Sequence, residues 1–165
     1  MNDITLAQAS KLTSPNPVCL ICTPRPDGTT NLATVSWWTY LSFHPETIGF
    51  AMSGKSYSGE LCRATGKVVL TVPGEELAEK VMKCGSCSGR NVDKAAELNV
   101  ELVSLPGSDI RVPAHSRVAL VCTLEKAVEA GDHVFHVCHV EKAYGDEAER
   151  ALFAWDGYSR VQTVD

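Results

Sequence analysis

Short apolar segments rich in β-branched residues recur along this chain, and each is bounded by proline, glycine or an Asp-Gly pair. The clearest are residues 18–23, 47–52 and 68–72. Segments of this length and composition predict buried strands. The pair Asp27-Gly28 predicts a hairpin, because glycine tolerates the positive φ that tight hairpin turns require. We expect the returning strand at residues 31–37.

The rest of the chain predicts more strands and a few short helices. Further strands are expected at residues 118–129, 134–142 and 151–155, and helices at residues 5–11, 59–65, 75–83 and 91–98. The helices do not alternate regularly with the strands, which disfavours a doubly wound parallel sheet. We expect a mainly β fold with short helices, built as a mostly antiparallel barrel. The length of 165 residues suits one domain over residues 1–165.

Charge and hydropathy exclude several classes of protein. The net charge of −5, with both signs interspersed, argues against a nucleic-acid partner, which would require a basic patch. No uncharged apolar stretch reaches the ~20 residues of a membrane helix, and the N-terminus does not resemble a secretory signal. We therefore expect a cytoplasmic protein, in which the seven cysteines are thiols.

The first candidate site is the loop between the strand at 47–52 and the helix at 59–65. Its candidate residues are Ser53, Lys55, Ser56, Tyr57 and Ser58. Free backbone N–H groups at a helix N-terminus bind phosphate, and a lysine and hydroxyl groups strengthen such a site. The alternative is a polar loop with a helix-capping serine. The common nucleotide and hydrolase motifs are absent, so any cofactor must be held by something other than a Rossmann turn.

Two other segments could contact a flat ligand. Residues 31–37 combine small and hydroxyl-bearing side chains with Trp37, so a ring could approach the backbone beside an aromatic wall. The alternative is a plain strand with one aromatic residue in the core. The turn Gly131-Asp132-His133 offers a histidine that could donate to a ligand, or it could be an ordinary surface turn. Nothing nearby has the spacing of a metal site.

Two cysteine pairs have C-x-x-C spacing. Cys19 and Cys22 lie in a predicted strand, where residues three apart point to opposite faces, so they are not expected to hold one metal ion. Cys84 and Cys87 follow a predicted helix. A dithiol that exchanges electrons is an open interpretation of this pair, although the strand–helix context of thioredoxin is missing.

Four segments together resemble the flavin reductase-like family, whose relatives include flavoredoxin. They are residues 31–37, 55–61, 84–94 and 131–133, and the resemblance runs from about residue 16 to residue 140. The most specific part is the S-G-R-x-V-D-K pattern at residues 88–94 followed by Gly131-Asp132-His133. Cys87 departs from the pattern of the family.

The resemblance implies an FMN-binding split β-barrel of Greek-key type, which forms a homodimer with a flavin near the interface. By position, the isoalloxazine ring and ribityl chain would be lined by Asn31, Leu32, Ala33, Thr34, Val35, Ser36 and Trp37. The phosphate would be held by Ser53, Lys55, Ser56, Tyr57 and Ser58. Lys94 and His133 match basic residues near the flavin and are candidates for a supporting catalytic role. Tyr158 would supply a C-terminal aromatic side chain.

The activity implied by the resemblance is that of an oxidoreductase. It would accept hydride from NADH or NADPH onto FMN and pass electrons to free flavin or to a partner protein. One alternative is a flavoredoxin-like electron carrier that keeps its FMN tightly bound and is not an enzyme. Another is a redox protein that uses Cys84 and Cys87 as a dithiol.

Overall fold

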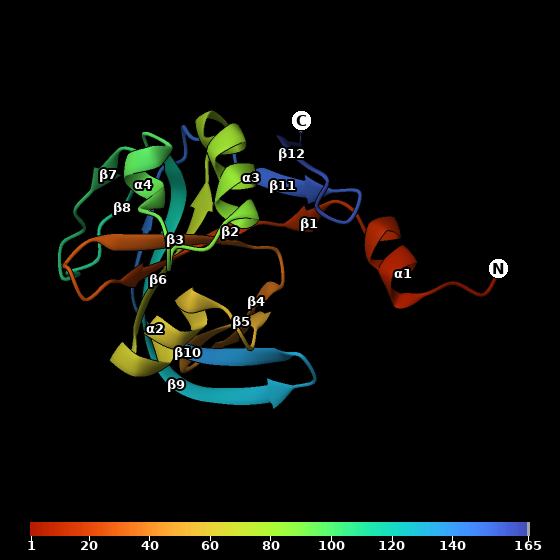
Figure 1. Ribbon diagram of the computed structural model, residues 1–165, viewed down its shortest axis with the longest axis horizontal. Coiled ribbons are helices and arrows are strands. Elements are labelled where there is room, and N and C mark those ends of the chain that lie inside the picture. Colours follow the sequence, from red (N-terminus) through yellow and green to blue (C-terminus); the bar gives the residue numbers. More distant parts are fainter. Residues whose placement is uncertain (165) are drawn as a thin grey trace.

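The computed structural model describes residues 1–164, and a seven-stranded antiparallel sheet dominates it (Figure 1). The strands follow the order β3-β2-β6-β9-β10-β5-β4. Their bounds are β2 (Cys19–Pro24), β3 (Thr30–Val35), β4 (Trp38–Phe43), β5 (Glu46–Ser53), β6 (Lys67–Pro73), β9 (Ser116–Ala130) and β10 (His133–Gly145). The sheet curls into a barrel, but its edge strands β3 and β4 form no ladder with each other. This split barrel confirms the predicted fold class.

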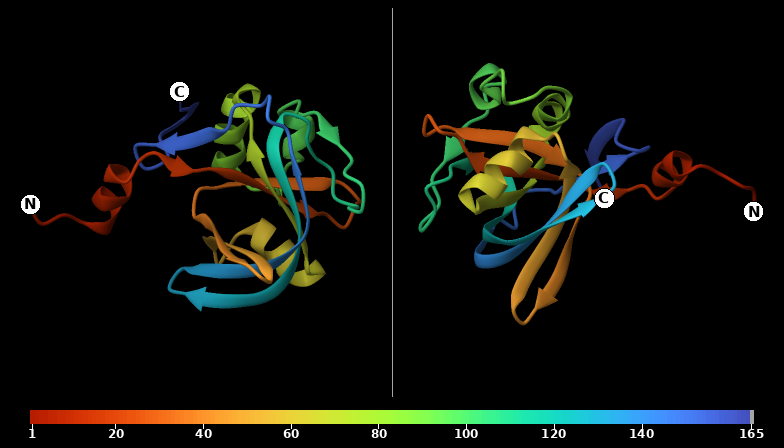
Figure 2. Two further views of the ribbon diagram at one scale, coloured as in Figure 1. Left: turned by 180° about the vertical axis from the view of Figure 1, so that it is seen from behind. Right: turned by 60° about the horizontal axis from the view of Figure 1, so that its bottom comes forward.

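Smaller elements surround the barrel. A three-stranded sheet joins β1 (Asn16–Pro17), β11 (Leu152–Trp155) and β12 (Arg160–Thr163), and β7 (Leu102–Val103) pairs with β8 (Val112–Pro113). The helices are α1 (Leu6–Leu12), α2 (Tyr57–Thr65), α3 (Ala78–Ser86) and α4 (Lys94–Glu97), with a 3₁₀ turn at Glu75–Leu77. Helix α1 extends away from the barrel (Figures 1 and 2) and buries none of its residues. Within residues 1–164, no helix has the length and apolar character needed to cross a membrane.

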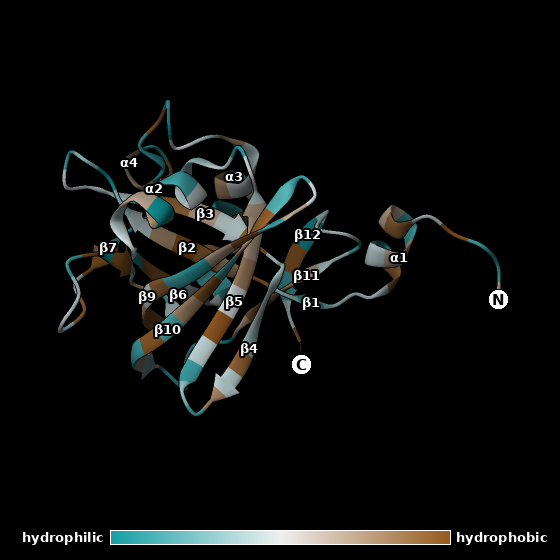
Figure 3. Cartoon of the chain, turned by 90° about the horizontal axis from the view of Figure 1, so that it is seen from below, coloured by the Kyte–Doolittle hydropathy of each residue, from teal (hydrophilic) through white to brown (hydrophobic). Residues whose placement is uncertain are grey.

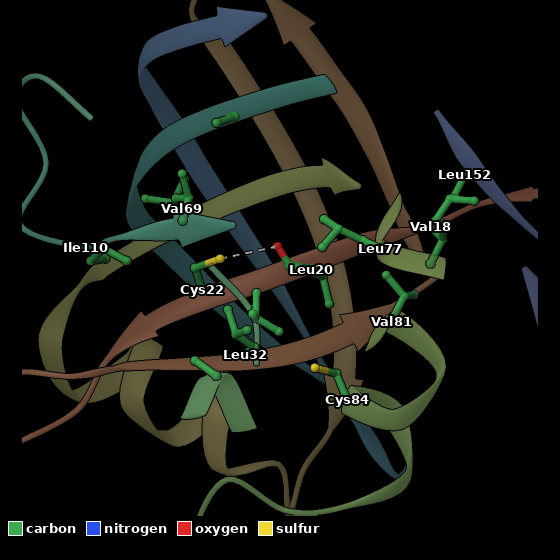
Figure 4. Packing of buried hydrophobic residues seen from close by; sticks show 14 of the residues in the cluster. Val18, Leu20, Cys22, Leu32, Val69, Leu77, Val81, Cys84, Ile110 and Leu152 are labelled. Atoms are coloured by element: carbon green, nitrogen blue, oxygen red, sulfur yellow. Dashed lines mark hydrogen bonds between the residues drawn. The ribbon is translucent and has the colours of Figure 1, made fainter. Parts of the chain in front are cut away.

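Strand β2 separates two hydrophobic cores. Successive strand residues point to opposite faces, so Cys19 and Ile21 lie in the barrel interior, whereas Leu20 and Cys22 face an outer layer. Helix α3 contributes Val81 and Cys84 to that outer core (Figure 4). The opposite directions of Cys19 and Cys22 agree with the prediction for this pair.

Two hairpins connect strands of the seven-stranded sheet. Gly28 has a φ of +82° in the turn that joins β2 to β3, as the Asp-Gly signal predicts. Gly131 has a φ of +65° in the turn between β9 and β10. Both hydrophilic and hydrophobic residues occur along β10 (Figure 3). Its burial alternates, because His136, Cys138 and Val140 are buried and the residues between them are half-buried, as expected for a strand with one face in the barrel.

Several boundaries differ from the sequence-based expectations. Strand β4 was not predicted, because it is an edge strand whose aromatic residues are largely exposed and whose register shifts between Tyr40 and Ser42. The strand expected at 31–37 ends at Val35, since the chain turns there towards β4. The helix expected at 91–98 is only the single turn α4, and the one at 75–83 begins as a 3₁₀ turn.

Candidate functional site

A cavity of about 650 Å³ opens between the barrel and the C-terminal end of α3. Its volume lies within the range of roughly 300–1,000 Å³ that is typical of small-molecule sites. The end of β3, the loop after β5, the start of α2 and the segment after α3 supply most of its wall. These segments are far apart in the sequence, and they come together only in the folded chain.

The N-terminus of α2 forms one end of the cavity. Ser56 caps the helix, because its side-chain oxygen accepts a hydrogen bond of 3.3 Å from the Gly59 N–H. The N–H groups of Tyr57 and Ser58 belong to the first turn, which has no intrahelical acceptors, and no other acceptor for them occurs in residues 1–164. Lys55 lies beside them with an exposed side chain. This arrangement suits an anion.

The buried side chain of Asn31 holds α2 against the barrel. Its Nδ2 donates to Ser58 Oγ at 2.6 Å and to Thr23 Oγ1 at 3.3 Å. Gly89 packs directly on the same amide, since a Cβ built on Gly89 would lie 1.7 Å from Asn31 Oδ1. Asn31 thus lies behind the cavity wall, where it positions α2 and the segment after α3. Leu32 is buried in the outer core, and neither residue lines the cavity.

The end of β3 and the residues after it form the long wall of the cavity. Ala33, Thr34, Val35, Ser36 and Trp37 all line it. The Thr34 hydroxyl donates to the Val81 carbonyl oxygen at 2.6 Å, which ties this wall to α3. Because the side chains of residues 33–36 are small, a planar group could lie close to the strand.

His133 lines the cavity, and the turn before it is hydrogen-bonded to the loop that precedes α2. The Gly54 N–H donates to the Asp132 carbonyl oxygen at 2.9 Å, and His133 pairs with Ser53 in the sheet. The imidazole ring packs against Trp37, with ring centroids 4.8 Å apart. Its Nδ1 lies 2.7 Å from Asp132 Oδ1, and this contact lowers the pKa of the Asp132 carboxyl.

Lys94 is a cation buried at the far side of the cavity, with 4% of its surface exposed. Its Nζ donates to the Cys84 carbonyl oxygen at 2.6 Å. Burial lowers the pKa of the ammonium, while the nearby thiols of Cys84 and Cys87 act in the opposite direction. A buried positive charge of this kind favours a neighbouring group that gains negative charge.

The structure brings together most of the residues that the sequence singled out. The cavity is lined by Ala33, Thr34, Val35, Ser36, Trp37, Ser53, Lys55, Ser56, Tyr57, Ser58, Lys94, His133 and Tyr158. The residues missed are Ser10, Thr13, Asn16, Ala51, Met52 and Gly157, together with four residues at and after the C-terminal end of α3, namely Gly85, Ser86, Ser88 and Gly89. The last four belong to the matched segment 84–94, so their glycines and serines were the available signal.

Two sequence comparisons bear on the family. The profile of the flavin reductase like domain matches residues 12–162. An uncharacterized protein of Archaeoglobus fulgidus is 33% identical over 117 residues, which are 66% of this chain. The match spans 65% of the length of that relative.

Solved structures with the same fold include two proteins that are named for redox functions. Flavoredoxin from Methanosarcina acetivorans superimposes with a TM-score of 0.85 at 20% identity, and the match covers 100% of this chain and 92% of flavoredoxin. The NADH:FAD oxidoreductase of Streptomyces globisporus gives a TM-score of 0.86 at 15% identity, covering 100% of this chain and 98% of the other. At these identities the likeness concerns the fold.

Proposed function

The chain belongs to the flavin reductase-like family, and on that premise we propose that it is an FMN-binding oxidoreductase. It takes hydride from NADH or NADPH and passes the electrons to free flavin or to a partner protein. The observation that carries this proposal is the single cavity that joins an anion-binding helix N-terminus to a wall of small side chains and a buried cation.

The cavity residues fit the three parts of FMN. The phosphate matches the first turn of α2 with Lys55, and the ring matches the wall of residues 33–37. Reduced flavin carries negative charge around N1 and O2, which a buried cation such as Lys94 or a donor such as His133 would stabilise. When bound, the isoalloxazine supplies the hydride-accepting chemistry. The residues of this chain bind it, orient it and limit its contact with water.

The absorption spectrum and a titration test the proposal. We expect purified protein to bind FMN with quenching of flavin fluorescence, and NADH or NADPH to bleach the bound flavin without oxygen. A protein that takes up no FMN would contradict the whole proposal.

The flavoredoxin-like carrier is the second candidate. Trp37 packs against His133 and is 57% exposed, so an electron-donating protein could dock beside the flavin. If neither nicotinamide bleaches bound FMN while a reduced ferredoxin does, the protein is a carrier and not a reductase.

We also propose a homodimer in the cytosol. Seven free thiols suit a reducing compartment. Strand β4 exposes Tyr40, Leu41 and Phe43, by 53%, 44% and 74%, and exposed apolar clusters mark interfaces. We expect a dimer in sedimentation velocity at micromolar concentration, and a monomer there would refute this assignment.

Ser56 offers a test that separates helix capping from phosphate binding. Ser56→Ala is expected to cost about 1 kcal/mol of stability, because the cap on Gly59 is lost. Ser56→Asp keeps a good cap, but it places a carboxylate where we position the phosphate, so it should weaken FMN binding more than Ser56→Ala does. Thermal unfolding and fluorescence titration measure the two effects. Equal FMN affinities for the two variants would show that the phosphate does not bind at this end of α2.

His133→Ala should change the flavin potential or turnover more than stability. The side chain is 27% exposed and its only hydrogen-bond partner in the described chain is the adjacent Asp132, and substitutions at such sites usually change stability by less than about 0.5 kcal/mol. Redox titration and steady-state kinetics are compared with thermal unfolding. Parallel losses of activity and melting temperature would instead indicate a structural histidine.

A further inference from the structure

We propose that Cys84 and Cys87 form a redox-active dithiol that passes electrons from the reduced flavin to a low-molecular-weight disulfide. The inference rests on the proposed flavin site, because the flavin is the source of electrons. Both cysteines line the same cavity as Lys55 and residues 33–37. A dithiol there would lie within the proposed flavin pocket.

The backbone places the two cysteines at a distance that permits a disulfide. Cys84 lies in the last turn of α3, and Cys87 directly follows its final residue, Ser86. Residues three apart on an α-helix have Cα atoms about 5 Å apart, within the range of roughly 4.4–6.8 Å found for disulfides. The Cys84 side chain packs on the outer core near Val81 (Figure 4), so closing the bond requires a rotation about its Cα–Cβ bond.

The two thiols differ in accessibility. Thiol–disulfide exchange needs one thiol that reaches the substrate and a second thiol that resolves the mixed disulfide. Cys87 is the exposed member, whereas Cys84 is 1% exposed. Burial raises the pKa of the Cys84 thiol to about 11, so Cys84 stays protonated while Cys87 can reach a substrate. The other five cysteines are all buried. Cys87 is therefore the attacking thiol and Cys84 the resolving one.

Lys94 interacts with both cysteines. Its Nζ donates to the Cys84 carbonyl oxygen, and its ammonium opposes the effect of burial on the pKa of the Cys84 thiol. The Cys84 and Cys87 thiols in turn act to raise the pKa of Lys94. No carboxylate forms an ion pair with Lys94 in residues 1–164. A cation without an acidic partner favours the thiolate that forms during exchange.

The chemistry balances without a further reagent. The S–S bond between Cys84 and Cys87 takes two electrons and two protons from fully reduced flavin, which gives two thiols and oxidised flavin. Cys87 then loses its proton to solvent and attacks the substrate disulfide, so a mixed disulfide forms and one substrate thiolate leaves and takes up a proton. Cys84 then attacks the Cys87 sulfur and its proton passes to the departing substrate thiolate, which restores the Cys84–Cys87 disulfide and releases the second substrate thiol.

The first test needs no flavin. Wild-type chain is treated with excess oxidised glutathione, alkylated and digested with trypsin, which yields residues 84–90 as one peptide. We expect this peptide unalkylated and lighter by two hydrogens. Cys84→Ser should accumulate a Cys87–glutathione mixed disulfide, and Cys87→Ser should form neither product. The peptide with Cys19 and Cys22 is the internal control, because these cysteines have the same spacing but opposite directions.

The second test follows electrons. FMN-loaded wild-type protein is reduced without oxygen and mixed with oxidised glutathione, and the blue flavin band is expected to return. This return should be lost in both serine variants, each first checked for FMN binding.

The dithiol, the electron transfer and the proposed function are each contradicted by a different result. A wild-type peptide that stays fully alkylated, or that stops at the mixed disulfide, would overturn the dithiol. Equal rates of flavin reoxidation in wild type and serine variants would overturn the electron transfer. Failure to bind FMN would instead contradict the proposed function, and the peptide result would still show whether the dithiol exists.

Discussion

Replacing Lys55 with alanine is expected to weaken FMN binding about tenfold while leaving riboflavin binding unchanged. A charge-assisted hydrogen bond contributes about 1.5–3 kcal/mol, and each 1.4 kcal/mol corresponds to about tenfold in affinity. Lys55 is exposed, so we expect the lower end of this range and a smaller effect at high salt. Riboflavin lacks the phosphate and therefore reports only on the ring wall. Fluorescence titrations at two salt concentrations measure both ligands.

Lys126→Ala is the matched control for this experiment. Lys126 is also exposed, but it lies on β9 and does not line the cavity. Its removal should change neither affinity. If Lys55→Ala weakened FMN and riboflavin binding equally, the loop at residues 53–58 would not be the phosphate site.

Gly89→Ala is expected to lower both stability and FMN affinity. The new Cβ would lie 1.7 Å from Asn31 Oδ1, so either Asn31 or the segment after α3 must move. Moving Asn31 breaks its bonds to Ser58 and Thr23, and buried groups left unpaired cost about 1–3 kcal/mol. For a chain of this size each kcal/mol lowers the melting temperature by roughly 2–4 °C. Calorimetry and FMN titration measure the two losses.

Gly85→Ala is a control that is expected to change stability in the opposite direction. A Cβ on Gly85 meets nothing closer than 3.5 Å, an ordinary contact with Tyr158. Gly85 lies within α3, where alanine favours the helix by up to about 1 kcal/mol over glycine. We expect Gly85→Ala to raise stability. Similar destabilisation by both substitutions would show that the segment tolerates no side chain, and that the contact with Asn31 is not the cause.

The barrel strands were predictable because their patterns are local. Residues 18–23 and 68–72 are continuous apolar runs, and β2 and β6 occupy them. Strand β4 was not predictable from the sequence, because Tyr40 and Phe43 are exposed along an edge whose register shifts. Such a strand depends on its partner β5 and on whatever covers its face, neither of which a local pattern contains.

The site was predictable where one segment carries several functional groups. The cavity is lined by residues 33–37, 53 and 55–58. Asn31 belongs to the same matched stretch but is 2% exposed, and its amide supports α2. Sequence spacing could not distinguish these roles, because they depend on where α2 and the segment after α3 pack against β3. The contribution of Ser10 and Thr13 from the α1 region depends on long-range packing that has no local signature.

Strand β2 is buried on both faces and is shared by both cores, with Leu20 and Ile21 at 1% and 0% exposure. Neither core can be dismantled alone, since separating either from β2 exposes apolar surface of the other. The barrel and the outer layer should therefore melt as one cooperative unit, and the amide hydrogens of β2 should exchange with solvent only when the whole chain opens. Because the cavity wall is formed by the neighbouring strand β3 and by α3, the geometry of the site persists until that global opening.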